Sequence, residues 1–468
     1  MRLLRRHCPR PPLHASRRAS RWLALPVLLG AGLVALPAEA ATLYEALAAA
    51  YSGNPTLEAA RADLRAVDEG VPQVLSEWRP TILGEVQGGR EWDKQRSPLP
   101  IEQDTKPRSY GVTVRQPVFD GFGTASGTSE AENRVEAGRA RLINTEQAVL
   151  LNAVSAYMAV VRDVAVLDLN RNNEKVLQAQ LEATQARFEV GELTRTDVAQ
   201  AQSRLQGAIA ARIQAEGQLT SSRAIYRQVI GEDPVDVAMP TDMPPLPASR
   251  EEAVALSQAA PNVQAAQFDE RAAKDNIDVQ FSDMLPSVAI EGSYQRRQEL
   301  GGPDSEVDVG SVLGTVTIPL YQAGAPDSRV RQSKQRYMQS RRLTDEALRA
   351  AEQEAITAWQ GLRTAVAQSQ SFEEQVKAAE LALEGVRQEQ EVGARTILDV
   401  LDAEQEALNA RVSLVSSQTD RVVAQYRLLA AGGALTAANL ALQVDYYDPR
   451  QHYDQVRDKF WGTGPSVE

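Results

Sequence analysis

The sequence predicts a mixed α and β fold, in which four short membrane strands and two very long helical hairpins form an internal tandem repeat. Three observations lead to this fold class. The chain opens with an export leader, its second half repeats the order of its first half, and two long segments contain no proline. No segment after the leader reads as a transmembrane helix. Any membrane insertion of such an exported chain therefore has to come from β-strands.

Residues 1–40 have the composition of a cleavable signal peptide. Seven arginines and no acidic residue fall within the first 21 residues, and an apolar stretch of 15 residues runs from Trp22 to Leu36. Ala38 and Ala40 then supply a small-residue cleavage site. A spanning helix needs roughly 20 apolar residues, so this stretch favours a leader over a membrane anchor. We expect cleavage after Ala40.

The residue types that carry most enzyme and metal chemistry are nearly absent. Cys8 is the only cysteine and would leave with the leader, and His452 would be the only remaining histidine. This composition excludes a disulfide framework and a thiolate metal site. The formal net charge of −12 argues against a nucleic-acid partner. We therefore expect no catalytic site, no metal, no cofactor and no nucleic acid.

Matching segments recur along the chain and divide it into two structural repeats. The segment 54–60 resembles 260–266 at an offset of 206, and Glu189–Gly191 matches Glu391–Gly393 at an offset of 202. The change in offset lies in the first half of each repeat, in a region that tolerates a difference in length. The predicted segments are a leader at 1–40, repeat 1 at 41–240, repeat 2 at 241–435 and a C-terminal tail at 436–468.

Each repeat carries two short stretches in which apolar and polar residues alternate. Alternation over about ten residues is the weak signature of a membrane strand, and a half-buried soluble hairpin would give the same pattern. Four such stretches in two matched pairs, in an exported acidic protein, favour membrane strands. The connections within each pair are rich in charge, Pro and Gly, which indicates exposed loops. The strands are predicted at about 81–92, 109–118, 287–296 and 310–320.

Each repeat then continues into a helical run of unusual length. No proline occurs between Pro117 and Pro234, or between Pro326 and Pro449. Apolar residues recur at spacings of three and four, with many alanines where helices would approach closely. At ~1.5 Å per residue, the longer arm of each hairpin would reach on the order of 100 Å. The hairpins are predicted at about 123–231 and 325–432, with turns at Gly191 and Gly393.

One chain does not supply enough strands to close a sheet in lipid. An unpaired strand edge would leave backbone N–H and C=O groups unsatisfied in hydrocarbon, at a cost of about several kcal/mol each. Two chains would give eight strands, whose lumen side chains largely fill, and three chains would give twelve. A conducting protein therefore has to be larger than a dimer, and we infer a trimer.

The second turn, from Val392 to Ala403, reads VGARTILDVLDA and closely resembles the tip motif of the TolC family of outer-membrane ducts. The first turn, from Val190 to Val198, resembles its partner in the other repeat. Proline–aromatic junctions at 117–121 and 319–321 resemble the strand-to-helix joins of the family. The resemblance covers nearly all of residues 41–435.

The resemblance implies a transmembrane β-barrel of twelve strands, four from each protomer of a homotrimer, continuous with a long periplasmic α-helical barrel. It implies a place in the outer membrane of a Gram-negative cell, in contact with outer-membrane lipid. A periplasmic adaptor, or membrane fusion protein, and an inner-membrane transporter would dock at the tip turns of Gly191 and Gly393. The implied function is a channel or exit duct for efflux pumps or type I secretion.

The resemblance also maps the pore-constriction carboxylates of the family onto Asp399 and Asp402. Their i,i+3 spacing puts both on one helix face, and three copies would bring six carboxylates around one axis. Such a ring would attract cations, and mutual repulsion would raise some of the carboxylate pKa values. The alternative is an ordinary solvated helix face. One departure from the family is Gln390, which stands where the best-known member has an aromatic residue.

Arg395, Thr196 and Asp197 map onto the polar links that hold the tip closed in the family. Arg395 precedes Asp399 by four residues, an order that is the weaker one for an intrahelical ion pair. Two interpretations therefore stay open for Arg395: a pair with Asp399 on its own helix, or a link to Asp197 on a neighbouring helix.

A second hypothesis, from another class, is a periplasmic structural or adaptor protein built on coiled-coil hairpins without a pore. Such a protein would fractionate with soluble or inner-membrane material, whereas a duct would fractionate with the outer membrane. An enzyme on a helical scaffold is disfavoured by the near absence of histidine and cysteine.

Overall fold

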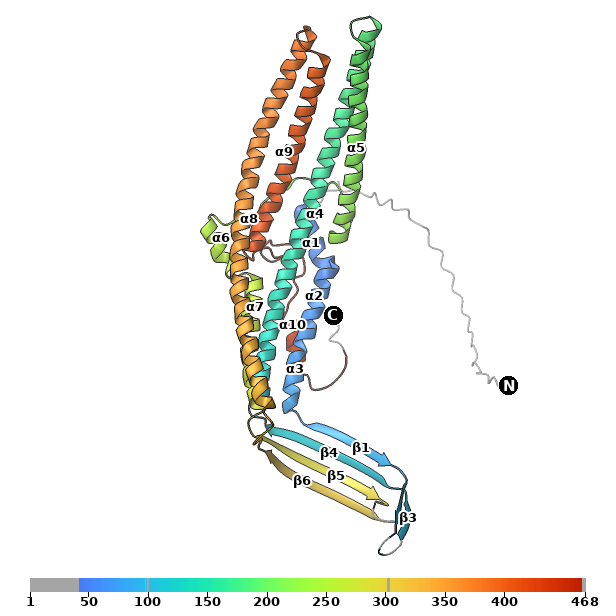
Figure 1. The fold of residues 1–468 in the computed structure, drawn as a ribbon, viewed down its shortest axis with the longest axis vertical. Coiled ribbons are helices and arrows are strands. Elements are labelled where there is room, and N and C mark those ends of the chain that lie inside the picture. The colour runs from blue at the N-terminus through green and yellow to red at the C-terminus, as the bar shows by residue number, and fades with distance from the viewer. Residues whose placement is uncertain (1–41, 97, 99–100, 301–303, 465–468) are drawn as a thin grey trace, which may run out of the picture. The chain divides into compact units, whose positions relative to one another are not determined.

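The computed structural model describes residues 42–96, 98, 101–300 and 304–464, so the leader predicted at 1–40 lies outside the described residues. Within the described range, the chain is built from long helical hairpins and a four-stranded antiparallel sheet (Figure 1). Both halves of the chain follow the same order. Short helices come first, then strands, and then a long hairpin.

Two helical hairpins contain most of the helix. The first pairs α4 (Gly123–Glu189) with α5 (Arg195–Ile230), and the second pairs α8 (Ala325–Glu391) with α9 (Ile397–Ala431). α4 and α8 each contain 67 residues, which at ~1.5 Å per residue gives a length of about 100 Å. Because α4 also contacts α9, the hairpins lie side by side with α5 and α8 in the outer positions (Figure 1).

Each hairpin turns on a glycine with a left-handed backbone. The φ angle is +85° at Gly191 and +78° at Gly393, a region in which residues with a Cβ are strained. The N–H of Gly191 donates to the carbonyl of Phe188, and the N–H of Gly393 donates to the carbonyl of Gln390. These bonds satisfy carbonyls that the helix end would leave free.

Short helices pack beside the hairpins, and local capping explains where they begin. α1 starts with a capping box in which Thr42 and Glu45 each accept the backbone N–H of the other. α2 starts at Pro55, after an Asn54 cap. α2 and α3 pack on α4, and α7 contacts both α4 and α8. The bounds are α1 Leu43–Gly53, α2 Pro55–Asp68, α3 Gly70–Leu75, η1 Ser76–Trp78, α6 Arg250–Ser257, α7 Pro261–Ser282 and α10 Gln451–Val456.

The main hydrophobic core lies where both hairpins meet α1, the segment 232–249 and the chain after α9. Tyr157 and Tyr426 are among its largest fully buried side chains. Leu246 packs against this core and also against a smaller cluster that contains Ala253 of α6. α1, α6, the segment 232–249 and residues 435–447 are therefore joined by packing, and we call these elements the middle band.

One helix among the described residues, α4, is long and apolar enough to cross a membrane by length and composition alone. Half of its apolar window is buried within the chain. The apolar run of α4 contributes Leu150, Val154 and Met158 to the core of the middle band. We expected no helix of this kind after the leader, and α4 is one by length and composition. Packing within the chain explains why its apolar residues are there.

Four strands form one antiparallel sheet in the order β1-β4-β5-β6. The pairing of β4 with β5 joins the first half of the chain to the second. Among the described residues, β1 and β6 each have a strand on one side only, so their outer edges carry unpaired backbone groups. The bounds are β1 Thr81–Gly88, β4 Arg108–Phe119, β5 Ser287–Gln298 and β6 Glu306–Thr317.

The first strand differs from its expected extent. The strand expected at 81–92 ends at Gly88, and the chain continues into a separate pair formed by β2 (Glu91–Gln95) and β3 (Ile101–Thr105). Gly88 and Gly89 interrupt the alternating pattern, because glycine has no side chain to pack on a sheet face. The region expected to be an exposed loop thus contains a second hairpin.

The last two strands extend further at their connection than the pattern indicates. Arg296 and Asp308 pair across β5 and β6, with 2.8 Å between Arg296 Nε and Asp308 Oδ1. The sequence placed Arg296 at the end of its strand and Asp308 in the connecting loop, whereas their cross-strand attraction supports two more ladder pairs beyond them. β6 ends at Thr317, because Pro319 cannot donate to a ladder.

The register gathers apolar residues of all four strands on one face of the sheet. Directly opposite residues in an antiparallel ladder point to the same face, and Val112 lies opposite both Gly84 and Tyr294. The other face carries polar side chains such as Glu85 and Ser293, with fewer apolar ones. The exposed apolar face consists of Ile82, Val86, Tyr110, Val112, Val114, Ile290, Tyr294, Val312 and Val316.

Candidate functional site at the hairpin tips

Both tips use the same capping box at the start of the returning helix. Thr194 caps α5 and Thr396 caps α9. The N–H of Asp197 donates to Thr194 Oγ1 at 3.3 Å, and the N–H of Thr194 donates to Asp197 Oδ2 at 2.8 Å. Thr396 and Asp399 repeat this pattern at 3.2 and 2.8 Å. The bonds pair N–H groups that a first helical turn leaves free. Thr196 lies in the first turn of α5 with an exposed side chain.

Capping lowers the pKa of both tip carboxyls. Hydrogen bonds from the side chain and the backbone of Thr396 hold the pKa of Asp399 below its ordinary value. Backbone and side-chain bonds from Thr194 lower the pKa of Asp197 in the same way. Such donors favour the charged form of a carboxyl, so both groups are ionised at neutral pH in the single chain. The rise expected from mutual repulsion concerns assembled copies.

Asp402 pairs with a residue that the sequence did not indicate. Arg204 of α5 lies 2.5 Å from it, measured between Arg204 Nη2 and Asp402 Oδ1. The two side chains are 40% and 58% exposed, and exposed pairs contribute only about 0–1 kcal/mol. The pair therefore matters more for position than for stability. It connects the two hairpins near their tips and orients Asp402. Arg204 is 198 residues from its partner, and no local pattern indicates it.

Arg395 is engaged within the second tip. Its Nε donates to Glu389 Oε2 at 2.8 Å. Arg395 precedes the cap residue Thr396 and lies outside α9, and its ion pair among the described residues is with Glu389. Together with the bonds from Thr396, its charge nevertheless helps to lower the pKa of Asp399. A contact between Arg395 and Asp197 is not among the interactions of the described part of the chain. The predicted closing link is therefore not made within one copy.

A small apolar core joins the hairpins behind the acidic pair. Ile397 and Leu401 of α9 pack with Leu205 of α5 and with leucines of α4. Ile397 and Leu401 are spaced i,i+4 and buried, so they occupy one face of α9. Asp399 and Asp402 lie on another face, where Asp399 is half-buried and Asp402 is exposed. The chain thus presents both carboxylates away from its own core.

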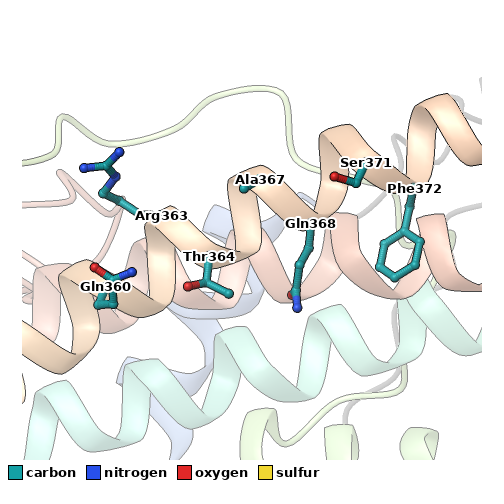
Figure 2. A pocket seen from close by; sticks show the side chains of 7 residues that line it. All are labelled: Gln360, Arg363, Thr364, Ala367, Gln368, Ser371 and Phe372. Carbon is teal, nitrogen blue, oxygen red and sulfur yellow. The ribbon is translucent and has the colours of Figure 1, made fainter.

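A shallow recess on α8 is the second surface feature of the hairpins (Figure 2). It is formed by one helix, and only Arg363 among its lining residues carries a charge. Small side chains at Ala367 and Ser371 lie between longer ones. The lining residues are Gln360, Arg363, Thr364, Ala367, Gln368, Ser371 and Phe372. Among the described residues, no group of three or more Asp, Glu, His or Cys side chains could hold a metal ion.

A sheet with one apolar face, joined to hairpins about 100 Å long that present capped carboxylates at their tips, defines the class of outer-membrane channel proteins. The family model for outer membrane efflux proteins matches residues 46–232 and 254–434, and the chain belongs to that family. It is an outer-membrane exit duct whose helical part lies in the periplasm. Proteins of this family are channels that work with pump or secretion components.

Individual relatives match over most of their length. The chain is 35% identical over 438 residues to the outer membrane efflux protein BepC of Brucella suis biovar 1, covering 93% of this chain and 95% of BepC. It is 27% identical to the outer membrane protein TolC of Vibrio cholerae, covering 88% of this chain and 95% of that protein. The crystal structure of the Campylobacter jejuni CmeC outer membrane channel shares the fold, with a TM-score of 0.75 at 15% identity over 89% of each chain.

Proposed function

We propose that three copies of this chain close a twelve-stranded barrel in the outer membrane. The observation that carries the proposal is a four-stranded sheet with one exposed apolar face and two open edges, β1 and β6. In hydrocarbon both edges have to be paired. Pairing β6 of one copy with β1 of the next satisfies all edges in a closed ring, and twelve strands leave a channel.

The hairpins support the same assembly, as a helical barrel in the periplasm. α5 and α8 occupy the outer positions of each copy, so they are the helices that would meet a neighbour. The recess on α8 favours this contact, because small side chains at Ala367 and Ser371 let a second helix approach closely. Each copy would then contribute two hairpins to the barrel wall, one from the repeat at 41–240 and one from the repeat at 241–435. The leader at 1–40 would be removed, and residues 436–468 would form the tail.

The tips form the regulated end of the duct in this proposal. Asp399 and Asp402 line the pore constriction, held by the capping box, the tip core and Arg204. Arg395 and Thr196 make their closing links between copies, because Arg395 does not reach Asp197 within one copy. Six ionised carboxylates around one axis would favour cations.

Partners follow from the turns at the two tips. The loops at Gly191 and Gly393 are where a periplasmic adaptor would dock and align an inner-membrane transporter. The chain would serve efflux pumps or type I secretion and carry no catalysis of its own. The alternative of an adaptor without a pore is disfavoured by the family match, which is to outer-membrane proteins.

A planar-bilayer recording on the purified protein, with its mass measured in detergent, tests the proposal. We expect the mass of three chains and a cation-selective conductance. Asp399→Asn with Asp402→Asn should keep the pore but lower its cation preference. Asp420→Asn, an exposed acid further along α9, is the control and should leave selectivity unchanged. A monomer without conductance would refute the duct assembly, and an unchanged preference in the double variant would refute the constriction assignment.

A further inference from the structure

The tail follows the side of the chain from the middle band to the sheet. The backbone N–H of Tyr447 donates to the hydroxyl of Tyr51 in α1 at 3.1 Å. At the start of α10, His452 Nδ1 lies 3.2 Å from a carboxylate oxygen of the buried Asp68 in α2. Arg457 then donates to Glu132 of α4 at 3.1 Å. These contacts fix the tail in steps along α1, α2 and α4.

The described part of the tail closes in a turn that Arg79 holds at the start of the sheet. Arg79 Nη1 donates to the carbonyl of Lys459 at 2.5 Å, and its guanidinium lies 4.4 Å from the centre of the Phe460 ring. Lys459 Nζ donates to the carbonyl of Gly464 at 3.0 Å and closes the turn. Arg79 stands two residues before Thr81, where β1 begins. We call residues 459–464 the terminal turn.

The terminal turn presents two aromatic rings to the surroundings. Phe460 is 72% exposed and Trp461 is 91% exposed. Trp78, next to Arg79 in the chain, is also exposed. The first residue of the apolar sheet face is Ile82. Three aromatic rings are thus held at the end of β1 where the apolar face begins.

The tail has to lie on the outside of the duct. It starts in the middle band, whose members are joined by packing on the hairpins. If the middle band faced the lumen, the band elements of every copy would fill the passage. Since the chain is an outer-membrane exit duct, the middle band and the tail lie on the outer wall, and the terminal turn faces the membrane boundary.

We propose that the terminal turn is an interfacial membrane anchor, in which Phe460 and Trp461 enter the headgroup region of the periplasmic leaflet beside β1. Tryptophan is enriched at this depth because its ring is apolar and its N–H finds polar partners. The ligand is phospholipid, and recognition depends on the rings. Arg79 and Lys459 are balanced by the nearby acids Glu77 and Asp458, so the anchor does not require anionic headgroups. The proposal rests on the outer-membrane location and goes beyond the duct function.

Site-specific labelling tests this contact, because Cys8 is the only cysteine of the sequence. In a Cys8→Ser background, Trp461→Cys carries a polarity-sensitive fluorophore, and the full assembly is placed in phosphatidylcholine vesicles that contain lipids with nitroxide quenchers at shallow or deep positions. Val86→Cys on the apolar sheet face and Ala255→Cys on α6 are controls. Both control residues are exposed in the single chain.

We expect the label at 461 to shift to the blue and to be quenched most by the shallow nitroxide. The label at 86 should be quenched most by the deep nitroxide, and the label at 255 by neither. Adding Arg79→Ala should reduce quenching at 461 and leave it unchanged at 86. If 461 behaves like 255, the anchor is refuted. A blue shift at 461 without quenching by either nitroxide would mean that the rings pack on a neighbouring copy, and it would also refute the lipid contact. Quenching at 86 reports insertion of the sheet independently.

Discussion

At the residue scale, the tip carboxylates combine a structural role with the proposed electrostatic one. Asp399 accepts the N–H of the α9 cap residue Thr396, and the bonds from Thr396 lower its pKa and so favour its ionised form. Its counterpart Asp197 caps α5 in the same way. A substitution at Asp399 would therefore change the helix start as well as the charge at the proposed constriction. Asp402, held by Arg204, does not cap a helix, so it separates the two effects.

The cap itself can be tested at Thr396. Thr396→Ala removes the side-chain acceptor for the N–H of Asp399 while keeping the carboxylate, and loss of such a cap costs about 1 kcal/mol of local stability. We expect faster amide hydrogen exchange in the first turn of α9 and an unchanged charge at the tip. Thr357→Ala, an exposed threonine inside α8, is the control. Equal exchange in the wild type and Thr396→Ala would contradict a capping role.

At the element scale, the spacing of apolar residues and the positions of glycine and proline predicted the hairpins and the four main strands. Gly191 and Gly393 mark turns because a left-handed backbone favours glycine, and this requirement is local. The capping boxes also have a local signal, Thr-x-x-Asp at the start of each returning helix, which is not among the features predicted above. The partner of Asp402 had no such signal. Arg204 is brought to it by the packing of two hairpins, and a pattern along one segment cannot report that.

The docking of α10 on α2 was equally invisible in the sequence, because it joins residues from opposite ends of the chain. Asp68 is fully buried beside His452. Burial raises its pKa above the ordinary value of 3.8, while His452 and Arg139 act in the opposite direction and Glu69 adds to the rise. The element that carries the terminal turn is thus attached through a titratable contact.

This contact predicts a pH dependence of stability. Because the pKa of Asp68 is higher in the folded than in the unfolded chain, the folded state binds more protons between the two values. The contribution of this carboxyl to stability therefore falls as pH rises through that window. Asp68→Asn should flatten this part of the curve, measured as the unfolding midpoint while the pH rises from below to well above the ordinary value of 3.8. Asp63→Asn, exposed on the same helix, should keep the wild-type slope, and a wild-type slope in Asp68→Asn would exclude the assignment.

At the scale of the whole molecule, the proposed assembly would complete what one copy of the sheet leaves open. Its two edges are open and its apolar face is exposed in a single copy. The sequence predicted this need from the number of strands, because the backbone requirement in lipid holds for any sequence. It could not predict which face is apolar across all four strands, since that depends on the register between β4 and β5 from different halves of the chain.

Adjacent positions in β6 test that face directly. Val312 lies on the apolar face and is 79% exposed, and Leu313 points to the other side and is 59% exposed. An arginine on a lipid-facing strand position costs about 2–4 kcal/mol near the bilayer midplane and much less toward the lumen. Val312→Arg should therefore lower the stability of the assembled protein in vesicles against urea, whereas Leu313→Arg should change it little. Both substitutions introduce arginine at neighbouring positions of one strand, at nearly the same depth in the membrane. A difference between them therefore reports which side of the sheet meets lipid. Equal losses, or a larger loss for Leu313→Arg, would mean that the face defined by the register does not contact the membrane.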